Sequence, residues 1–397
     1  MNNKFDELTK SMAQSVTRRA ALKKFGVGLA GLALAGLLAR PAEAQVALGP
    51  PIELSFPNPL VGCDNGLNPG GTWTLPDAAE SYVVVNPLNP KNIAVAWMGA
   101  KVQAMFTAAS FDGGATWQLS VLPLTLCFGG PYLGSGDPWL SFAPNGDLYA
   151  SALTGNSFSA KLLVSCKSTD GGLHWSAPAI VTNYKNPNAP TITADPTDPR
   201  FVYATWSQEG PTKPQFARST DGGLTWEPQQ SVTTSGFADA CQVFVLPDGT
   251  LVELYANDSK HILHGARSAD RGQTWSDLGK LIQMAPVGVL DPEQGLPIWA
   301  SLSPYFAEDA RNGNLYVVWW DGRFSNFQYG DIAFSMSTDG GFTWSSPIRV
   351  NQTPLNIAPA NRQAFIPAIA VAANGTIGVL YYDFRFNDSN PGLLTDC

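Results

Sequence analysis

The chain has 397 residues and a formal net charge of −8 at neutral pH, and 44% of its residues are hydrophobic. A chain of this length can bury a large core. The negative charge argues against nucleic acids and anionic membranes as partners, because both attract a basic surface.

Residues 1–44 have the pattern of an export signal, which lies outside the fold. The paired arginines Arg18-Arg19 precede an uncharged run from Phe25 to Ala39, and Ala42-Glu43-Ala44 supplies small residues that signal peptidase recognises. The alternative is a membrane anchor, but this run is shorter than the ~20 residues that span a bilayer. The pattern resembles a twin-arginine signal. We therefore expect cleavage near Ala44–Gln45, export to the periplasm or the extracellular space, and no membrane span in the mature chain.

Residues 45–80 contain a sequence related to a motif that follows later in the chain. Asn68-Pro69-Gly70-Gly71-Thr72-Trp73 is a degenerate form of that motif. If it is a true copy, this segment supplies the outer strands of the last blade of a ring, so that pairing of the two chain ends closes the ring and leaves few exposed edges. The competing interpretation is a truncated chain with an unfinished blade.

From residue 81 onward the sequence repeats. Five octapeptides of the form S-x-D-x-G-x-[TH]-W, such as "STDGGLTW" at 219–226, are separated by 49 to 69 residues, and their aspartates are Asp112, Asp170, Asp221, Asp270 and Asp339. Such a period suits one four-stranded sheet per repeat, which is the unit of a β-propeller.

The segments between the octapeptides carry a second repeat. Each pairs two apolar runs around a Pro/Asn/Asp/Gly turn, the signature of a β-hairpin; the six copies lie at 83–97, 139–153, 191–206, 243–255, 306–320 and 369–382. A third apolar run leads into each octapeptide, and the Trp of the octapeptide begins a fourth strand. We therefore predict an all-β fold over residues 81–397, a six-bladed β-propeller of four-stranded antiparallel blades with few helices.

The octapeptide itself is typical of a structural turn. Its Asp can accept hydrogen bonds from the turn that it starts, and the second Gly position is occupied by glycine in every copy, as a positive φ would require. A catalytic role needs one converging set of groups rather than five equivalent ones. A calcium loop is the other alternative, but the octapeptide lacks the alternating oxygen ligands of such loops.

Cysteine and histidine give no sign of a metal site. The five cysteines have no zinc-motif spacing, Cys166 and Cys241 lie in strand-like runs that predict burial, and a Cys63–Cys127 bridge is one possibility. His174 replaces the Thr of the other copies and is expected to be an exposed turn residue. We expect no cofactor and a monomer.

The octapeptide at this period resembles the Asp box of the sialidase (neuraminidase) superfamily, also called the bacterial neuraminidase repeat. The resemblance extends from Asn68 to about Arg385. It implies a propeller whose active site lies at the mouth opposite the boxes. Asp-box propellers also include other glycosidases and non-catalytic binding proteins.

If this resemblance holds, the site residues lie at the ends of the second strands and in the connections into the first strands. An acidic, arginine-rich mouth with aromatic walls suits a glycan or another carboxylate-bearing small ligand. By analogy, three arginines would hold a substrate carboxylate, a Tyr paired with a Glu would be the nucleophile, and an Asp would be the acid. The candidates are Arg323, Arg362 and Arg385 for the clamp, with Asp321 beside them, Tyr382 or Tyr381 for the nucleophile, Glu209 as its partner, and Asp137 or Asp383 as the acid.

The sequence also departs from the family pattern. The Arg-Ile-Pro motif expected before the first blade is missing, and no arginine occurs between Arg40 and Arg200. The alternative interpretation of Asp321–Arg323 and Asp383–Arg385 is that each forms a structural ion pair. The first functional hypothesis is an exported sialidase-like glycoside hydrolase that acts on sialosides or another glycan, with two carboxylates as acid and base if the substrate is not a sialoside. The alternative is a non-catalytic exported propeller that binds a glycan or a protein.

Overall fold

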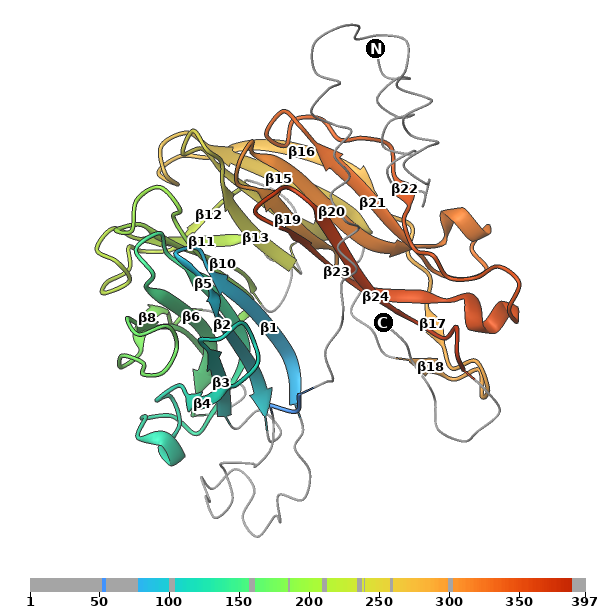
Figure 1. Cartoon of the computed structure of the whole chain (residues 1–397). Helices are drawn as coiled ribbons and strands as arrows, with labels where there is room; N and C mark the ends of the chain where they lie inside the picture. Colours follow the sequence, from blue (N-terminus) through green and yellow to red (C-terminus); the bar gives the residue numbers. More distant parts are fainter. Residues whose placement is uncertain are drawn as a thin grey trace, which may run out of the picture.

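The computed structural model describes residues 52–54, 78–99, 104–156, 161–184, 186–208, 213–233, 238, 240–257, 260–298 and 303–387. These residues form five four-stranded antiparallel sheets and two two-stranded hairpins. In the first four blades, the first strands of successive sheets contact one another, and Figure 1 shows the sheets fanned one after another as the blades of a propeller. The predicted all-β propeller is confirmed.

The strands of the five four-stranded blades follow chain order. They are β1 (Ala78–Asn86), β2 (Asn89–Gly99), β3 (Ala104–Ser110) and β4 (Gln118–Val121); β5 (Gly134–Phe142), β6 (Leu148–Gly155), β7 (Lys161–Ser168) and β8 (Ala179–Thr182); β9 (Pro187–Ala194), β10 (Val202–Gln208), β11 (Gln215–Ser219) and β12 (Gln230–Ser231); β13 (Ala240–Val245), β14 (Leu251–Asn257), β15 (Ile262–Ser268) and β16 (Ser276–Gln283); β19 (Tyr305–Asp309), β20 (Asn314–Asp321), β21 (Asp331–Ser337) and β22 (Ile348–Arg349).

The core lies between the blades. The second strands of the second to fifth blades are almost entirely buried, since each of these blades has a neighbouring sheet on both faces, and their runs are correspondingly rich in apolar residues. One cluster joins Leu254 of the fourth blade to Trp319 of the fifth, and another joins Met105 of the first blade to Leu148 of the second. Packing of sheet on sheet, rather than one central core, therefore holds the blades together.

The prediction of six four-stranded blades is wrong for the described residues, which contain five. The sixth sheet is a two-stranded hairpin, β23 (Ala364–Val371) and β24 (Ile377–Asp383), that packs against the fifth blade. The hairpin signal in the sequence reports only the first two strands of a blade, and the third and fourth strands depend on an octapeptide between them. No octapeptide follows β24 within the described residues. The candidate copy at 68–73 lies outside the described residues, so ring closure by the segment 45–80 stays a prediction.

Helical structure is limited to three single turns within the described part of the chain. They are the 3₁₀ helices η1 (Leu126–Phe128), η2 (Gly322–Ser325) and η3 (Pro359–Arg362). The second small hairpin, β17 (Val289–Leu290) and β18 (Pro297–Ile298), is inserted between the fourth and fifth blades. Among the helices that the structure describes, none is long and apolar enough to cross a membrane.

The cysteines behave as buried or bridged groups. Cys166 and Cys241 are buried, as predicted. Cys127 is disulfide-bonded. The predicted partner Cys63 lies outside the described residues, so the predicted pairing stays a prediction.

Candidate functional site

The five octapeptides form one recurrent structure, called here the repeat turns, between the third and fourth strands of each blade. In the turn at 219–226, the Asp221 carboxylate accepts hydrogen bonds from the Ser219 hydroxyl at 2.7 Å and from the Thr225 amide and hydroxyl at 2.9 and 2.6 Å. These bonds lower the pKa of Asp221, although partial burial opposes them. The carboxylate is thus occupied by its own turn.

The other copies keep the same bonds. Asp112, Asp270 and Asp339 each accept from the Ser two residues earlier and from the Thr four residues later. In the copy with His174, the ring Nδ1 lies 2.6 Å from Asp170 and takes the place of the Thr hydroxyl. His174 is exposed, as predicted, but it also preserves the turn.

The repeat turns also join neighbouring blades. The carbonyl of the first Gly position accepts a hydrogen bond from the preceding blade, for example from the Tyr149 hydroxyl to Gly222 at 3.1 Å. Equivalent donors are Asn92 to Gly171, Arg218 to Arg271 and Arg267 to Gly340. The repeat turns therefore have a structural role on this face of the propeller.

The opposite face, called here the mouth, contains the ends of the second strands. Asp321 ends β20 and is fully buried. Its carboxylate accepts from the Trp319 indole at 2.6 Å, from the Ala285 amide at 3.0 Å, and from the amide and guanidinium of Arg323 at 2.8 to 2.9 Å. Asp321 and Arg323 therefore bind each other directly, and they do not face each other across an open cavity.

Asp383 ends β24 and forms a similar pair with Arg385. The guanidinium contacts Asp383 at 2.6 to 3.0 Å and donates to the Tyr381 hydroxyl at 3.0 Å. The Thr353 hydroxyl donates to the same carboxylate at 2.6 Å. The pKa of Asp383 is lowered because the hydrogen bonds from Arg385 and Thr353 outweigh its burial, so this residue is a carboxylate at neutral pH.

Pairs of the type Asp-x-Arg also occur on the face of the repeat turns. Arg200 binds Asp198 and Arg311 binds Asp309 through the backbone amide, Nε and Nη2, with the same atoms as in the two mouth pairs. Because the geometry recurs on both faces, the local sequence spacing is sufficient to produce it. An Asp-x-Arg pair alone therefore does not identify a site.

The remaining mouth candidates lie beside these pairs. Arg362 ends η3 and donates through Nε to the Ile357 carbonyl at 3.0 Å. Tyr382 has 38% of its surface exposed and stacks on Phe365 with ring centroids 6.1 Å apart. Figure 1 shows the hairpin β17–β18 beside β24. Val289 of this hairpin packs on Phe365 and Phe384. Glu209 lies outside the described residues.

A pair of carboxyl groups lies on the first strands of two blades at the mouth, and only one of the two was predicted from the sequence. The Asp137 amide on β5 donates to Glu80 Oε2 on β1 at 3.2 Å, and Asp137 Oδ2 accepts from the Ala189 amide on β9 at 3.1 Å. Glu80 keeps solvent contact along its side chain, yet its pKa is raised to about 7, first by burial of the carboxyl group and then by the charge and hydrogen bond of Asp137. Burial, and then the charge of Glu80, raise the pKa of Tyr305 on the fifth blade.

The backbone explains why these two acids meet. Glu80, Asp137 and Ala189 all have positive φ, at 55°, 52° and 45°, and each lies at a break in strand register. Such β-bulges redirect side chains. Asp137 was a candidate from the sequence, whereas Glu80 was not, because Glu80 precedes the first clear hairpin. The signal that could have found it is its position two residues before Tyr82, which matches Asp137 before Trp139.

No group of metal-ligating side chains occurs in the described ranges. The charged groups above are instead matched by hydrogen bonds and ion pairs within the protein. What the arrangement can supply chemically is a carboxyl that is protonated near neutral pH at Glu80, a carboxylate at Asp383, and guanidinium and phenol groups next to it.

The comparisons with known proteins agree with this fold. No family model matches the chain. The chain is similar to a sialidase of Bacteroides fragilis, with 26% identity over 302 residues that cover 68% of this chain and 52% of the relative. It therefore spans about half the length of the curated relative that it matches.

Two solved structures share the architecture. The intramolecular trans-sialidase of Ruminococcus gnavus has 13% identity and a TM-score of 0.51, covering 77% of this chain and 90% of that one. An α-L-arabinofuranosidase of Fusarium graminearum has 15% identity and a TM-score of 0.50, covering 77% and 88%. At these identities the likeness shows the fold, and the chain is a propeller of the kind that sialidases and other glycoside hydrolases use.

Proposed function

We propose that this protein is a glycoside hydrolase that acts on a glycan at the mouth, the face opposite the repeat turns. The observation that carries the proposal is the Glu80–Asp137 pair, in which one carboxyl has a pKa near 7. Glycoside hydrolysis requires a carboxylic acid that is still protonated at the working pH to protonate the leaving oxygen. The resemblance to a sialidase and to an arabinofuranosidase supports a glycan as the substrate.

Glu80 is the proton donor in this proposal. Burial, and then the negative charge of Asp137, keep Glu80 protonated, and Asp137 is itself held by the Ala189 amide. Tyr382, which stacks on the buried Phe365, provides an exposed aromatic surface, and Arg385 and Arg362 provide donors for glycan hydroxyl or carboxylate groups. The sialoside form of the proposal adds Arg323 to the clamp and Tyr382 as the nucleophile with Glu209. Because Asp383 is a carboxylate bound to Arg385, the role of acid stays with Glu80. We also propose that the protein is exported by its twin-arginine signal.

The first experiment is a hydrolysis screen with fluorogenic glycosides that include a sialoside and an α-L-arabinofuranoside. Activity should fall as pH rises through about 7, because Glu80 loses its proton there. Glu80→Gln should lower kcat/KM about 100-fold or more. Asp137→Asn should move the alkaline limb of the pH profile to lower pH, because it removes the charge that raises the pKa of Glu80. An unchanged profile in both variants would refute the role of this pair.

The second experiment tests the arginine with a matched control. Arg385→Ala and Arg311→Ala break the same Asp-x-Arg geometry, but only Arg385 lies at the mouth. We expect Arg385→Ala to lower kcat/KM by about 100-fold, as loss of one charged donor commonly does, and Arg311→Ala to change it by less than about threefold. Equal losses in the two variants would show that both arginines act through stability alone.

A non-catalytic glycan-binding propeller is the second candidate function. It is favoured by the pairing of Arg323 and Arg385 with their own aspartates, which leaves less of each guanidinium for a substrate. Glycan-array binding that depends on Arg385, together with no turnover of any glycoside in the screen, would select this function over hydrolysis.

A further inference from the structure

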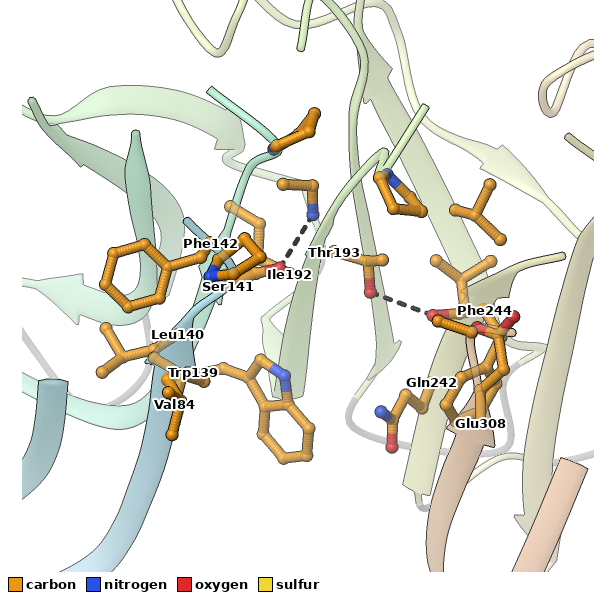
Figure 2. A pocket seen from close by; sticks show the side chains of 18 of the residues that line it. Val84, Trp139, Leu140, Ser141, Phe142, Ile192, Thr193, Gln242, Phe244 and Glu308 are labelled. Carbon is orange, nitrogen blue, oxygen red and sulfur yellow. Dashed lines mark hydrogen bonds between the residues drawn. The ribbon is translucent and has the colours of Figure 1, made fainter. Parts of the chain in front are cut away.

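A cavity of about 400 Å³ lies among the first strands of the five four-stranded blades, away from the mouth. Its lining includes Pro87, Pro144 and Pro196, which belong to the turns after β1, β5 and β9. In antiparallel blades these turns share a face with the repeat turns. The cavity, called here the channel pocket and shown in Figure 2, therefore belongs to the opposite end of the central channel from the proposed glycan site.

Most of the wall of the channel pocket is apolar or aromatic. Trp139, Phe142 and Phe244 line it together with several valines and prolines. Tyr82 stacks on Trp139 with ring centroids 3.9 Å apart and fixes its plane. A preformed, mainly apolar cavity with a few polar groups is the usual form of a small-ligand site.

The hydroxyl groups of the wall already serve the protein. The Ser141 hydroxyl accepts from the Ala194 amide at 2.9 Å, and the Thr193 hydroxyl donates to the Val243 carbonyl at 2.9 Å, as the dashed lines in Figure 2 show. A sugar or other polyol, which needs many polar partners, would therefore find few here. This leaves Gln242 and Glu308 as the side chains that can select a ligand.

Glu308 is the one acidic side chain that lines the channel pocket. Its Oε1 atom is buried and has no hydrogen-bond partner in the described part of the chain. Burial, and then the charge of Asp309, raise the pKa of Glu308 to about 8, while a backbone hydrogen bond from Val245 opposes the shift. Asp309 is itself tied to Arg311, and the neighbouring strands β13 and β23 carry no acidic or basic side chain.

We propose that the channel pocket binds a small primary amine whose ammonium group pairs with Glu308 and whose apolar body lies against Trp139, Phe142 and Phe244. An uncompensated carboxyl in an apolar site calls for a cation as its partner, and aromatic walls are favourable neighbours of an ammonium group. Gln242 lies three residues before Val245 on β13, about 10 Å along the strand. A polar group at the far end of the ligand would meet Gln242.

The proposal does not depend on the glycan site, and it predicts a linked proton release. Below about pH 8 the carboxyl of Glu308 is protonated and must ionise to receive the ammonium group. An alkylamine keeps its own proton to about pH 10. Amine affinity should therefore rise about tenfold per pH unit up to about pH 8 and then level off, with about one proton released per amine at the lower pH values.

The test is isothermal titration calorimetry of the full chain with n-hexylamine and the neutral analogue n-hexanol at several pH values and in buffers of different ionisation enthalpy. Saturable hexylamine binding with proton release, and hexanol binding that is weaker and independent of pH, support the proposal. Absence of hexylamine binding at about pH 9, equal binding of the two probes, or binding without proton release overturns it.

Two variants test whether the carboxyl group that binds the ammonium belongs to Glu308. Glu308→Gln should reduce hexylamine binding to the level of hexanol and remove its pH dependence. Glu253→Gln is the matched control, because Glu253 is also buried with a raised pKa but does not line the pocket. Unchanged hexylamine binding in Glu308→Gln, or loss in Glu253→Gln alone, contradicts the assignment. The proton-release measurement needs no variant, so it decides the question even if Glu308→Gln does not fold.

Discussion

The two faces of the propeller differ in how their polar groups are organised. On the face of the repeat turns, one bonding pattern recurs from blade to blade, and each carboxylate is satisfied within eight residues of sequence. At the mouth, the second strands end on different residues, including Gln208, Asn257, Asp321 and Asp383. Regularity thus marks the face that builds the fold, and irregularity marks the face where a specific ligand can be selected.

The largest expected difference between the faces concerns removal of an aspartate. Asp321→Ala leaves Arg323 and the Trp319 indole without their acceptor in a buried site. Breaking such a pair from one side costs about 3–5 kcal/mol of the free energy of unfolding. Asp221→Ala removes bonds at a partly exposed turn and should cost about 1 kcal/mol. Denaturant unfolding of both variants checks the order, and a larger loss for Asp221→Ala would contradict it.

The second prediction compares two glycines within the repeat turns. A Cβ on Gly272 would clash with the Phe216 ring, whereas one on Gly114 has its nearest neighbour at 3.7 Å, and both residues have positive φ. Gly114→Ala should cost about 1–2 kcal/mol from the backbone alone, and Gly272→Ala should cost about 1–3 kcal/mol more from the clash. Thermal unfolding of the two variants measures the difference; equal costs would mean that the turn moves away from the ring.

The third prediction concerns Glu253, buried between the third and fourth blades and bonded to Thr205. Burial raises its pKa from 4.5 to about 8, so the folded state holds a proton that the unfolded state loses. As the pH rises from about 4.5 to about 8, Glu253 should therefore lower the free energy of unfolding by roughly 1.4 kcal/mol per pH unit. Glu253→Gln should flatten the dependence of stability on pH, as measured by urea unfolding between about pH 5 and pH 9. An equally steep dependence in the variant would argue against a buried neutral acid.

The smallest expected effect is at His174, where the sequence repeat is broken but the bonding is kept. His174→Thr should leave the free energy of unfolding within about 0.5 kcal/mol, because a Thr hydroxyl makes the same contact in four other turns. His174→Ala should cost up to about 1 kcal/mol, because the side-chain bond to Asp170 is lost. A cost for Thr as large as that for Ala would mean that the ring contributes more than this contact.

The sequence by itself determined the elements that depend on short segments. The repeat turns follow from a Ser, an Asp and a Gly at fixed spacing, and the strand pairs follow from apolar runs around a turn, so the propeller and its two faces were predictable. The Asp-x-Arg pairs are equally local, which is why the same spacing produces them on both faces.

Only the tertiary structure decided the number of complete blades and the groups that meet across blades. Glu80 and Asp137 are 57 residues apart, and strand bulges bring them together. The channel pocket likewise combines Trp139 with Glu308 from distant blades. Contacts between blades depend on how whole sheets stack, and no periodicity within one repeat encodes that information.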